Sequence, residues 1–125
     1  MSRTAATFPA RTVFIIEDDA AVRDSLCMVV RGAGYVVRDF PEGRVFLDQA
    51  RPSSGDVVIL DIDLPMLSGV DIVDELRIRG WICPILVISG LRAAAFSQGV
   101  AQIAPYRAFR KPLDHRELLT ALHTA

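Results

Sequence analysis

The chain has one lysine among its 125 residues, no long apolar run and almost no net charge. Its apolar stretches are far shorter than the roughly 20 residues that span a bilayer, which argues against a membrane segment. The net charge of -1 and the lack of a basic run argue against direct nucleic-acid binding by this chain. These shortages favour a globular domain that is neither a membrane protein nor a nucleic-acid binder.

Cysteine is scarce too. Cys27 and Cys83 lie in apolar patterns and share no spacing typical of a metal site. We expect two reduced core thiols in a cytoplasmic protein, not a disulfide. Residues 1–10 carry one charge and lack the apolar segment of a secretion signal. They are expected to form a disordered lead-in to a single domain over 11–125.

The rest of the chain alternates short apolar runs with helical patterns. Its content of 51% hydrophobic and 23% charged residues is typical of a packed globule. Periodicity, caps and breakers predict helices over 20–32, from 41 to about 50, from 70 to about 80, over 92–100 and from 115 to at least 122. Strands are predicted over 13–16, 35–37, 57–60, 85–88 and 106–110.

Strands that alternate with helices in this way predict a parallel sheet covered on both faces. The runs at 13–16, 57–60 and 85–88 are continuously apolar, as expected of central strands, whereas the other two are more polar and typical of edges. The predicted order is 2-1-3-4-5 with right-handed crossovers, a flavodoxin-like (βα)5 fold. In this topology a ligand binds at the carboxyl ends of the first and third strands.

Acidic residues stand at the ends of those two central strands. Glu17 and Asp18 follow the first, and Asp61 and Asp63 end the third. Clustered carboxylates repel one another unless a cation neutralises them, and a set of oxygen ligands without His or Cys favours Mg²⁺ over zinc. We expect Asp18 and Asp61 to bind Mg²⁺ directly. Glu17 would act through water, and the backbone carbonyl of Asp63 would supply a further oxygen.

Two other strand ends carry groups that suit phosphoryl chemistry. Ser89 and Gly90 end the fourth strand, and Lys111 with Pro112 follows the fifth. A carboxylate beside Mg²⁺ and an ammonium can attack a phosphoryl donor, so Asp61 is the expected nucleophile. Lys111 would bind the phosphoryl oxygens as a point charge, Ser89 would donate a hydrogen bond, and Gly90 leaves the approach open. Each group alone has an ordinary explanation as a cap, a turn or a loop residue, but their joint placement indicates a site.

The chain resembles the receiver domain of two-component response regulators, and within that family it is similar to the FixJ-like receivers. The resemblance is carried by VFIIEDD (13–19), VVILDIDLPMLSG (57–69), ISG (88–90) and KP (111–112). It implies that a sensor histidine kinase or a histidine phosphotransfer protein phosphorylates Asp61 in the presence of Mg²⁺. It also implies that Ser89 moves toward the phosphoryl group and that the Lys111–Pro112 peptide is cis.

The resemblance further implies how the phosphorylated state is tuned and read. Asp63 and Leu91 lie where the family sets phosphate lifetime, and because Leu91 cannot orient an attacking water we expect slow self-dephosphorylation. The chain would then be no enzyme beyond accepting phosphate and losing it slowly. Receivers usually carry Phe or Tyr where this chain has Ala108, so the Ser89 loop or Tyr106 would report phosphorylation. Output is expected through the fourth helix, fifth strand and fifth helix, toward a downstream protein or a second copy of the chain.

Two alternatives stay open. Residues 59–63 (ILDID) mimic the DxD signature of haloacid-dehalogenase-like phosphohydrolases, which also use an aspartate nucleophile, although Leu64 follows where a small residue is expected. Ala108 instead suggests a receiver-like interaction module that no longer responds to phosphate. Because the sequence stops at its last predicted helix, we expect either a receiver that acts alone or a part of a longer regulator.

Overall fold

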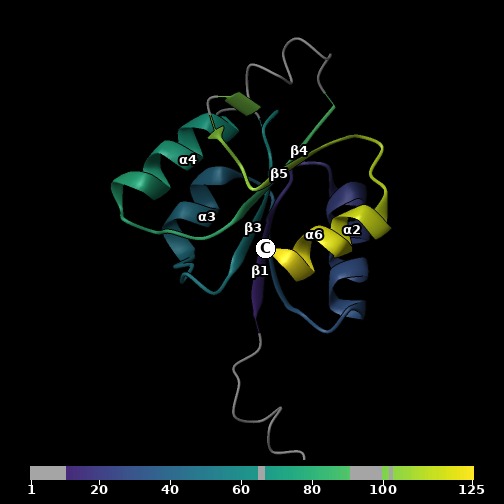
Figure 1. Cartoon of the computed structure of the whole chain (residues 1–125). Helices are drawn as coiled ribbons and strands as arrows, with labels where there is room; N and C mark the ends of the chain where they lie inside the picture. The colour runs from purple at the N-terminus through teal and green to yellow at the C-terminus, as the bar shows by residue number, and fades with distance from the viewer. Residues whose placement is uncertain (1–10, 65–66, 91–99, 102) are drawn as a thin grey trace, which may run out of the picture.

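The computed structural model describes residues 11–64, 67–90, 100–101 and 103–125. Within these residues, five parallel strands form one sheet in the order β2-β1-β3-β4-β5, which confirms the predicted topology. Figure 1 shows the sheet between two layers of helices. The strands are β1 (Thr12–Ile16), β2 (Val36–Phe40), β3 (Val57–Asp61), β4 (Ile85–Ser89) and β5 (Arg107–Arg110).

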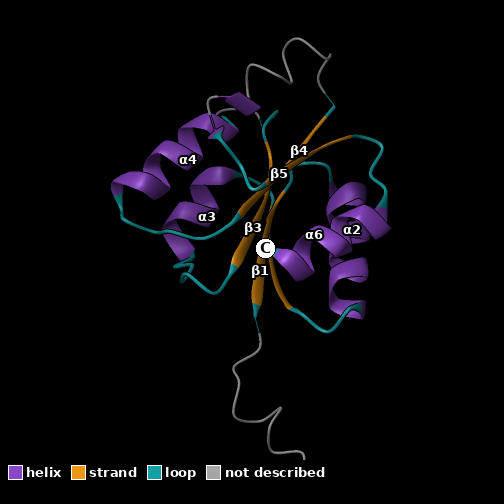
Figure 2. Cartoon of the chain, in the orientation of Figure 1, coloured by secondary structure: helices purple, strands orange, loops and turns teal. Residues whose placement is uncertain are grey.

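Helices cover both faces of this sheet, as a parallel sheet with crossover connections requires. Figure 2 shows α2 (Ala20–Gly32) and α6 (His115–Thr124) together on one face, with α3 (Gly43–Gln49) and α4 (Gly69–Ile78) on the other. None of the described helices is long and apolar enough to cross a membrane. The architecture is therefore the doubly wound α/β fold that the sequence predicts.

Two apolar cores, one on each face, hold the sheet in register. Successive residues of a strand point to opposite faces. Val13 and Ile15 of β1 accordingly pack with residues of α2 and α6, whereas Phe14 and Ile16 pack with residues of α3 and α4. All of β3 is buried. A slip of one residue would exchange the two sets of side chains, so the cores fix the register.

The register aligns the carboxyl ends of the strands at one edge of the sheet. Asp61 of β3 pairs with Ile88 of β4, and Ser89 pairs with Arg110 of β5. On the other side of β3, β1 ends beside Leu60. The residues that follow β1 and β5 therefore reach the same edge as the last residues of β3 and β4.

Polar side chains cap the N-termini of the helices that begin near this edge. The Asp19 side chain accepts hydrogen bonds from two backbone amides in the first turn of α2. Ser68 forms a capping box with Asp71 at the start of α4, and Asp114 caps α6. Such caps satisfy amides that have no partner within the helix. Because α2 begins only after Asp19, the preceding acids stay outside the helix, at the end of the sheet.

Several boundaries differ from those predicted. β2 runs to Phe40 instead of stopping at residue 37, because an edge strand with exposed Arg38 and Asp39 has no continuous apolar pattern. α3 begins at Gly43, since Glu42 before it is extended. The predicted helix over 92–100 lies outside the described residues except at its end, where 100, 101 and 103 are helical. The predicted lead-in over 1–10 also lies outside them.

Both cysteines are free, as predicted. Cys27 belongs to α2 and is buried in the core, whereas Cys83 is only partly buried in the segment between α4 and β4. Cys83 nevertheless packs against the core under α3 and α4. Its neighbours in the sequence, Ile82 and Pro84, belong to a connection that runs along the surface, where Ile82 is strongly exposed.

Candidate functional site

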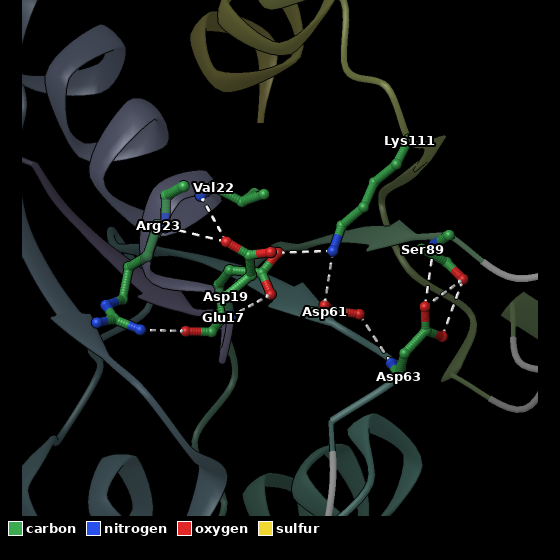
Figure 3. Close-up of polar contacts among 10 residues, drawn as sticks. Glu17, Asp19, Val22, Arg23, Asp61, Asp63, Ser89 and Lys111 are labelled. Carbon is green, nitrogen blue, oxygen red and sulfur yellow. Dashed lines mark hydrogen bonds and ion pairs between the residues drawn. The ribbon is translucent and has the colours of Figure 1, made fainter.

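Acidic, hydroxyl and ammonium groups meet at the carboxyl edge of the sheet, beyond β1, β3, β4 and β5 (Figure 3). Asp61 is the last residue of β3 and Ser89 the last residue of β4, and both are buried. Glu17 follows β1 and is buried as well. Lys111 extends from the end of β5 toward these acids. The structure thus brings together side chains from all four strand ends that the sequence singled out.

The ammonium of Lys111 lies between two carboxylates. Its Nζ atom is 2.8 Å from Oε1 of Glu17 and 3.0 Å from Oδ2 of Asp61. Partial burial lowers the pKa of Lys111, but its contacts with the two carboxylates raise that pKa by more, so the pKa lies above the ordinary range of a lysine. Lys111 is therefore a fixed positive charge beside Asp61 throughout the physiological pH range.

Glu17 is a buried acid next to a second acid. Burial is the largest cause that raises its pKa, the neighbouring Asp61 raises it further, and Lys111 offsets only part of the shift, so the pKa is about 7. Its Oε1 atom lies at ion-pair distance from Lys111 yet has no hydrogen bond of good direction within the described part of the chain. A buried oxygen with unused acceptor capacity suits a cation site.

The acidic cluster has the composition of a site for a hard divalent cation. Glu17, Asp18 and Asp61 each offer an oxygen, and these oxygens lie within 4.8 Å of one another. Asp18 is exposed whereas the other two acids are buried, so one side of the cluster faces solvent. Carboxylate oxygens are ligands that Mg²⁺ prefers, and a divalent ion would replace the proton that burial favours on Glu17. The residues present therefore fit Mg²⁺.

The side chain of Asp63 makes contacts that sequence reasoning missed. The prediction concerned only its backbone carbonyl and its place in the motif. Its Oδ1 and Oδ2 atoms accept from Oγ of Ser89 at 3.0 and 3.3 Å, and Oδ2 also accepts from the backbone amide of Gly90 at 2.9 Å. Its own amide donates to Oδ1 of Asp61 at 2.8 Å (Figure 3). The available signal was an acid two residues past one strand end, beside a Ser-Gly pair on the neighbouring strand.

Arg23 of α2 holds the backbone of the segment that carries Glu17 and Asp18. Its Nη1 atom donates to the backbone carbonyl of Glu17 at 2.8 Å (Figure 3). Its Nε atom lies 3.3 Å from Oδ2 of Asp39. Asp19 caps α2 immediately afterwards. The backbone is therefore held on both sides of Asp18, which restricts where its exposed carboxylate reaches.

The segment that carries Lys111 is held by the neighbouring strand. The backbone amide of Lys111 donates to the carbonyl of Ser89 at 2.8 Å. The Lys111–Pro112 peptide is cis, as the resemblance implied. The backbone hydrogen bond continues the pairing between β4 and β5 by one residue, and the lysine side chain reaches toward Asp61 (Figure 3).

The residues expected to report phosphorylation lie apart from the acids. Ala108 is half-buried in β5 and packs against the core under α3 and α4. Tyr106 lies at the other end of β5 from Lys111, and its hydroxyl donates to the carbonyl of Thr124 at 2.9 Å. The structure therefore does not bring Tyr106 to the site. Leu91 lies outside the described residues.

A hollow of about 670 Å³ opens beside Lys111. One wall comes from the first two turns of α2, and the other comes from the connection between β5 and α6. Gly90 and Lys111 line it too. Its walls include Val22, Ser25, Leu26, Pro112, Leu113 and His115. The hollow therefore leaves open space next to Lys111.

Residues 13–123 match the family described as the response regulator receiver domain. The chain belongs to this family. The receiver is 33% identical over 116 residues to the response regulator protein TodT of Pseudomonas putida, which is 93% of this chain and 51% of TodT. It is 26% identical over 113 residues to the transcriptional regulatory protein FixJ of Azorhizobium caulinodans, which is 90% of this chain and 54% of FixJ.

A solved structure has the same fold. The chemotaxis protein CheY4 of Vibrio cholerae superposes on the receiver with a TM-score of 0.81 at 24% identity, covering 93% of this chain and 98% of that one. The receiver spans about half the length of the curated relatives it matches. The predicted family, including its likeness to FixJ, is confirmed, and the chain is a signalling receiver of two-component response regulators. This membership favours the receiver over the phosphohydrolase alternative.

Proposed function

We propose that the receiver accepts a phosphoryl group on Asp61 from the phosphohistidine of a sensor histidine kinase or a histidine phosphotransfer protein. The observation that carries the proposal is the bridge from Lys111 to Glu17 and Asp61 at 2.8 and 3.0 Å, which places a fixed cation beside a buried carboxylate. An ammonium in this position stabilises the negative charge that gathers on phosphoryl oxygens during transfer.

The transfer step involves one bond made and one broken. A carboxylate oxygen of Asp61 forms a bond to phosphorus while the phosphorus–nitrogen bond of phosphohistidine breaks. The electron pair of that bond returns to the imidazole, which takes up a proton from water. Lys111 pairs with the new phosphoryl oxygens, and Oγ of Ser89, on the adjacent strand, is the nearby hydroxyl donor. The product is an acyl phosphate on Asp61.

The metal that this chemistry needs would be held by the acidic cluster. Asp18 and Asp61 are the proposed direct ligands, Glu17 the proposed ligand through water, and the Asp63 carbonyl a further oxygen. Bound Mg²⁺ supplies positive charge to the phosphoryl oxygens and lowers the repulsion between carboxylates. The exposed position of Asp18 lets the ion enter from solvent without opening the core.

The hollow beside Lys111 is the proposed path for the donor histidine. Its walls come from α2 and from the connection after β5, and Lys111 and Gly90 of the site line it as well. A phosphohistidine carried on a partner helix needs such an opening, because Asp61 itself is buried. The partner would therefore contact α2 and the segment 112–115.

Output is proposed to pass through the face formed by β5, α6 and residues 100, 101 and 103, toward a downstream protein or a second copy of the receiver. Ala108 leaves this face without the usual aromatic reporter. The Ser89 loop, which joins the site to residues 100 and 101, is the proposed transmitter. Because Ala108 also suits a module that ignores phosphate, binding of a phosphoryl mimic to the site must be tested directly.

Phosphotransfer from candidate histidine kinases to the receiver tests the proposed acceptor. We expect stoichiometric, acid-stable and alkali-labile labelling that requires Mg²⁺ and is lost in Asp61→Asn. The exposed residue Asp74 of α4 gives a matched control, since Asp74→Asn makes the same charge change outside the cluster. Circular dichroism checks that both variants keep their helices.

Three results would contradict the proposal. Undiminished labelling of Asp61→Asn would place the acceptor elsewhere. Many turnovers of phosphate release would identify a phosphohydrolase. If Mg²⁺ with beryllofluoride, a phosphoryl mimic, neither binds nor alters partner binding or oligomeric state, the receiver is a phosphate-insensitive module.

A further inference from the structure

Two hydrogen-bond donors at the end of β4 converge on one carboxylate. Oγ of Ser89 donates to Oδ1 and Oδ2 of Asp63 at 3.0 and 3.3 Å, and the backbone amide of Gly90 donates to Oδ2 at 2.9 Å. Ser89 is fully buried. A hydroxyl and an amide that point at the same anion form an oxyanion site, because hydrogen bonds to a charged acceptor are about twice as strong as neutral ones.

This oxyanion site adjoins the phosphoacceptor. The amide of Asp63 donates to Oδ1 of Asp61 at 2.8 Å, so the two acids share a tight turn. A methyl group added at Gly90 would lie 3.8 Å from Oδ2 of Asp63 and 3.8 Å from Cδ of Lys111. Gly90 therefore lies close to both the Asp63 carboxylate and the lysine that contacts Asp61. A phosphoryl group on Asp61 would carry its oxygens into this same neighbourhood.

We propose that the Asp63 carboxylate is an internal ligand that occupies the Ser89–Gly90 oxyanion site and must leave it before a phosphoryl group on Asp61 can use those donors. The inference rests on the proposed function and adds a competing anion to it. Asp63 is in this view a positioning residue that acts through Ser89. It holds the Ser89 hydroxyl and the Gly90 amide in the resting state and sets the cost of phosphorylation.

The competition predicts which way a substitution changes binding. In Asp63→Ala the two donors no longer bind this carboxylate, so the receiver binds a phosphoryl mimic more tightly. Loss of the negative charge alone would also favour an anion, however, and that effect does not depend on the Ser89 hydroxyl. The two causes separate when the same substitution is made with and without that hydroxyl.

Calorimetric titration of the full chain with beryllofluoride in Mg²⁺ measures this difference. We expect Asp63→Ala to bind about tenfold more tightly than the parent, since two hydrogen bonds to a charged group are released. In the Ser89→Ala background the gain should fall severalfold. Asp63→Asn keeps the shape of the side chain and one acceptor oxygen. Its affinity for beryllofluoride should therefore lie between those of the parent and Asp63→Ala. An equal gain in both backgrounds, or no gain, would overturn the inference while beryllofluoride binding keeps the proposed function standing.

A second measurement needs no phosphoryl mimic. The amide proton of Gly90 is hydrogen-bonded to a carboxylate, so its NMR resonance should lie well downfield in the resting receiver. In Asp63→Ala this resonance should move upfield, whereas the amide resonance of the distant Gly55 should not shift. A Gly90 amide that is unaffected by the substitution would show that the contact does not exist in solution and would end the inference. If the parent and all variants fail to bind beryllofluoride, the proposed function fails first and the inference with it.

Discussion

At the scale of single residues, the position of Lys111 explains why an arginine-rich chain keeps one lysine. Outside the site, the ion pairs found in the described residues use arginine, as in Arg23–Asp39 and Arg79–Glu75. The compact ammonium of Lys111 contacts Glu17 and Asp61 together, whereas a planar guanidinium presents its donors in a fixed fork. The site, not the general composition, therefore selects lysine here.

The environment of Cys83 gives a pH-dependent test at this scale. Burial raises the pKa of its thiol to about 11, and the nearby Asp56 adds to the shift. Only the thiolate reacts with iodoacetamide, so we expect alkylation of Cys83 at pH 8 to be at least about tenfold slower than that of an ordinary cysteine. The rate should keep rising as the pH approaches 11. Peptide mapping by mass spectrometry separates Cys83 from Cys27.

The urea-unfolded chain provides the control for this measurement. Both thiols should then react at the ordinary rate, with half-maximal reactivity near pH 8.5. Equal alkylation rates of Cys83 in the folded and unfolded chain at pH 8 would show that its surroundings are more polar than the structure indicates.

The placement of the site residues was predictable where it depends on position in the chain. Asp61, Ser89 and Lys111 each stand at the end of a short apolar run, and parallel strands bring such ends together. The contacts of the Asp63 side chain were not predictable in this way. They depend on a side-chain torsion, and that torsion is set by the donors of Ser89 and Gly90 on a strand that is distant in sequence.

At the scale of elements, the start of α4 packs tightly against the loop that follows Asp61. A methyl group built on Gly69 would lie 2.7 Å from the Cα atom of Ile62 and 2.9 Å from its Cγ2 atom. Ile62 stands between Asp61 and Asp63 in the sequence. The close approach of helix and loop therefore requires glycine and supports the backbone on which both acids depend.

Gly69→Ala tests this contact. The added methyl group meets backbone atoms that cannot rotate away, so we expect the free energy of unfolding to fall by about 1–3 kcal/mol in urea titrations. Gly32 at the end of α2 is the matched control, because nothing lies within 4 Å of a methyl group there. Gly32→Ala should leave stability unchanged or raise it by up to about 1 kcal/mol. Equal effects of the two substitutions would contradict the packing of α4 against Ile62.

Buried strands were predicted more accurately from the sequence than exposed ones. The central strands β1, β3 and β4 are apolar on both faces and were placed within about a residue from the sequence alone. The edge strand β2 was predicted too short, since its exposed residues follow no apolar pattern. Helix starts with a side-chain cap, such as those at Asp19 and Asp114, were predicted better than the start of α3, where Glu42 makes no cap hydrogen bond.

At the scale of the whole molecule, the site is assembled from four strand ends and belongs to no single element. Glu17, Asp61, Ser89 and Lys111 come from β1, β3, β4 and β5 or the residues that follow them. Their distances hold only while the sheet keeps its order and register. Whatever binds the assembled cluster must therefore stabilise the entire fold, because the unfolded chain does not present the cluster.

Magnesium binding should accordingly raise the thermal stability of the receiver. At a tenfold excess over its dissociation constant, a ligand specific for the folded state adds about 1.4 kcal/mol, or about 3–6 °C in Tm for a domain of this size. Calorimetric melts in MgCl2 and in NaCl of equal ionic strength measure the difference. Asp18→Asn should remove most of the increment without lowering Tm in NaCl, since Asp18 is exposed and its charge adds to the repulsion in the cluster. Asp74→Asn on α4 should keep the increment. An equal rise in both salts, or a full rise in Asp18→Asn, would mean that the cluster of Glu17, Asp18 and Asp61 does not hold the ion.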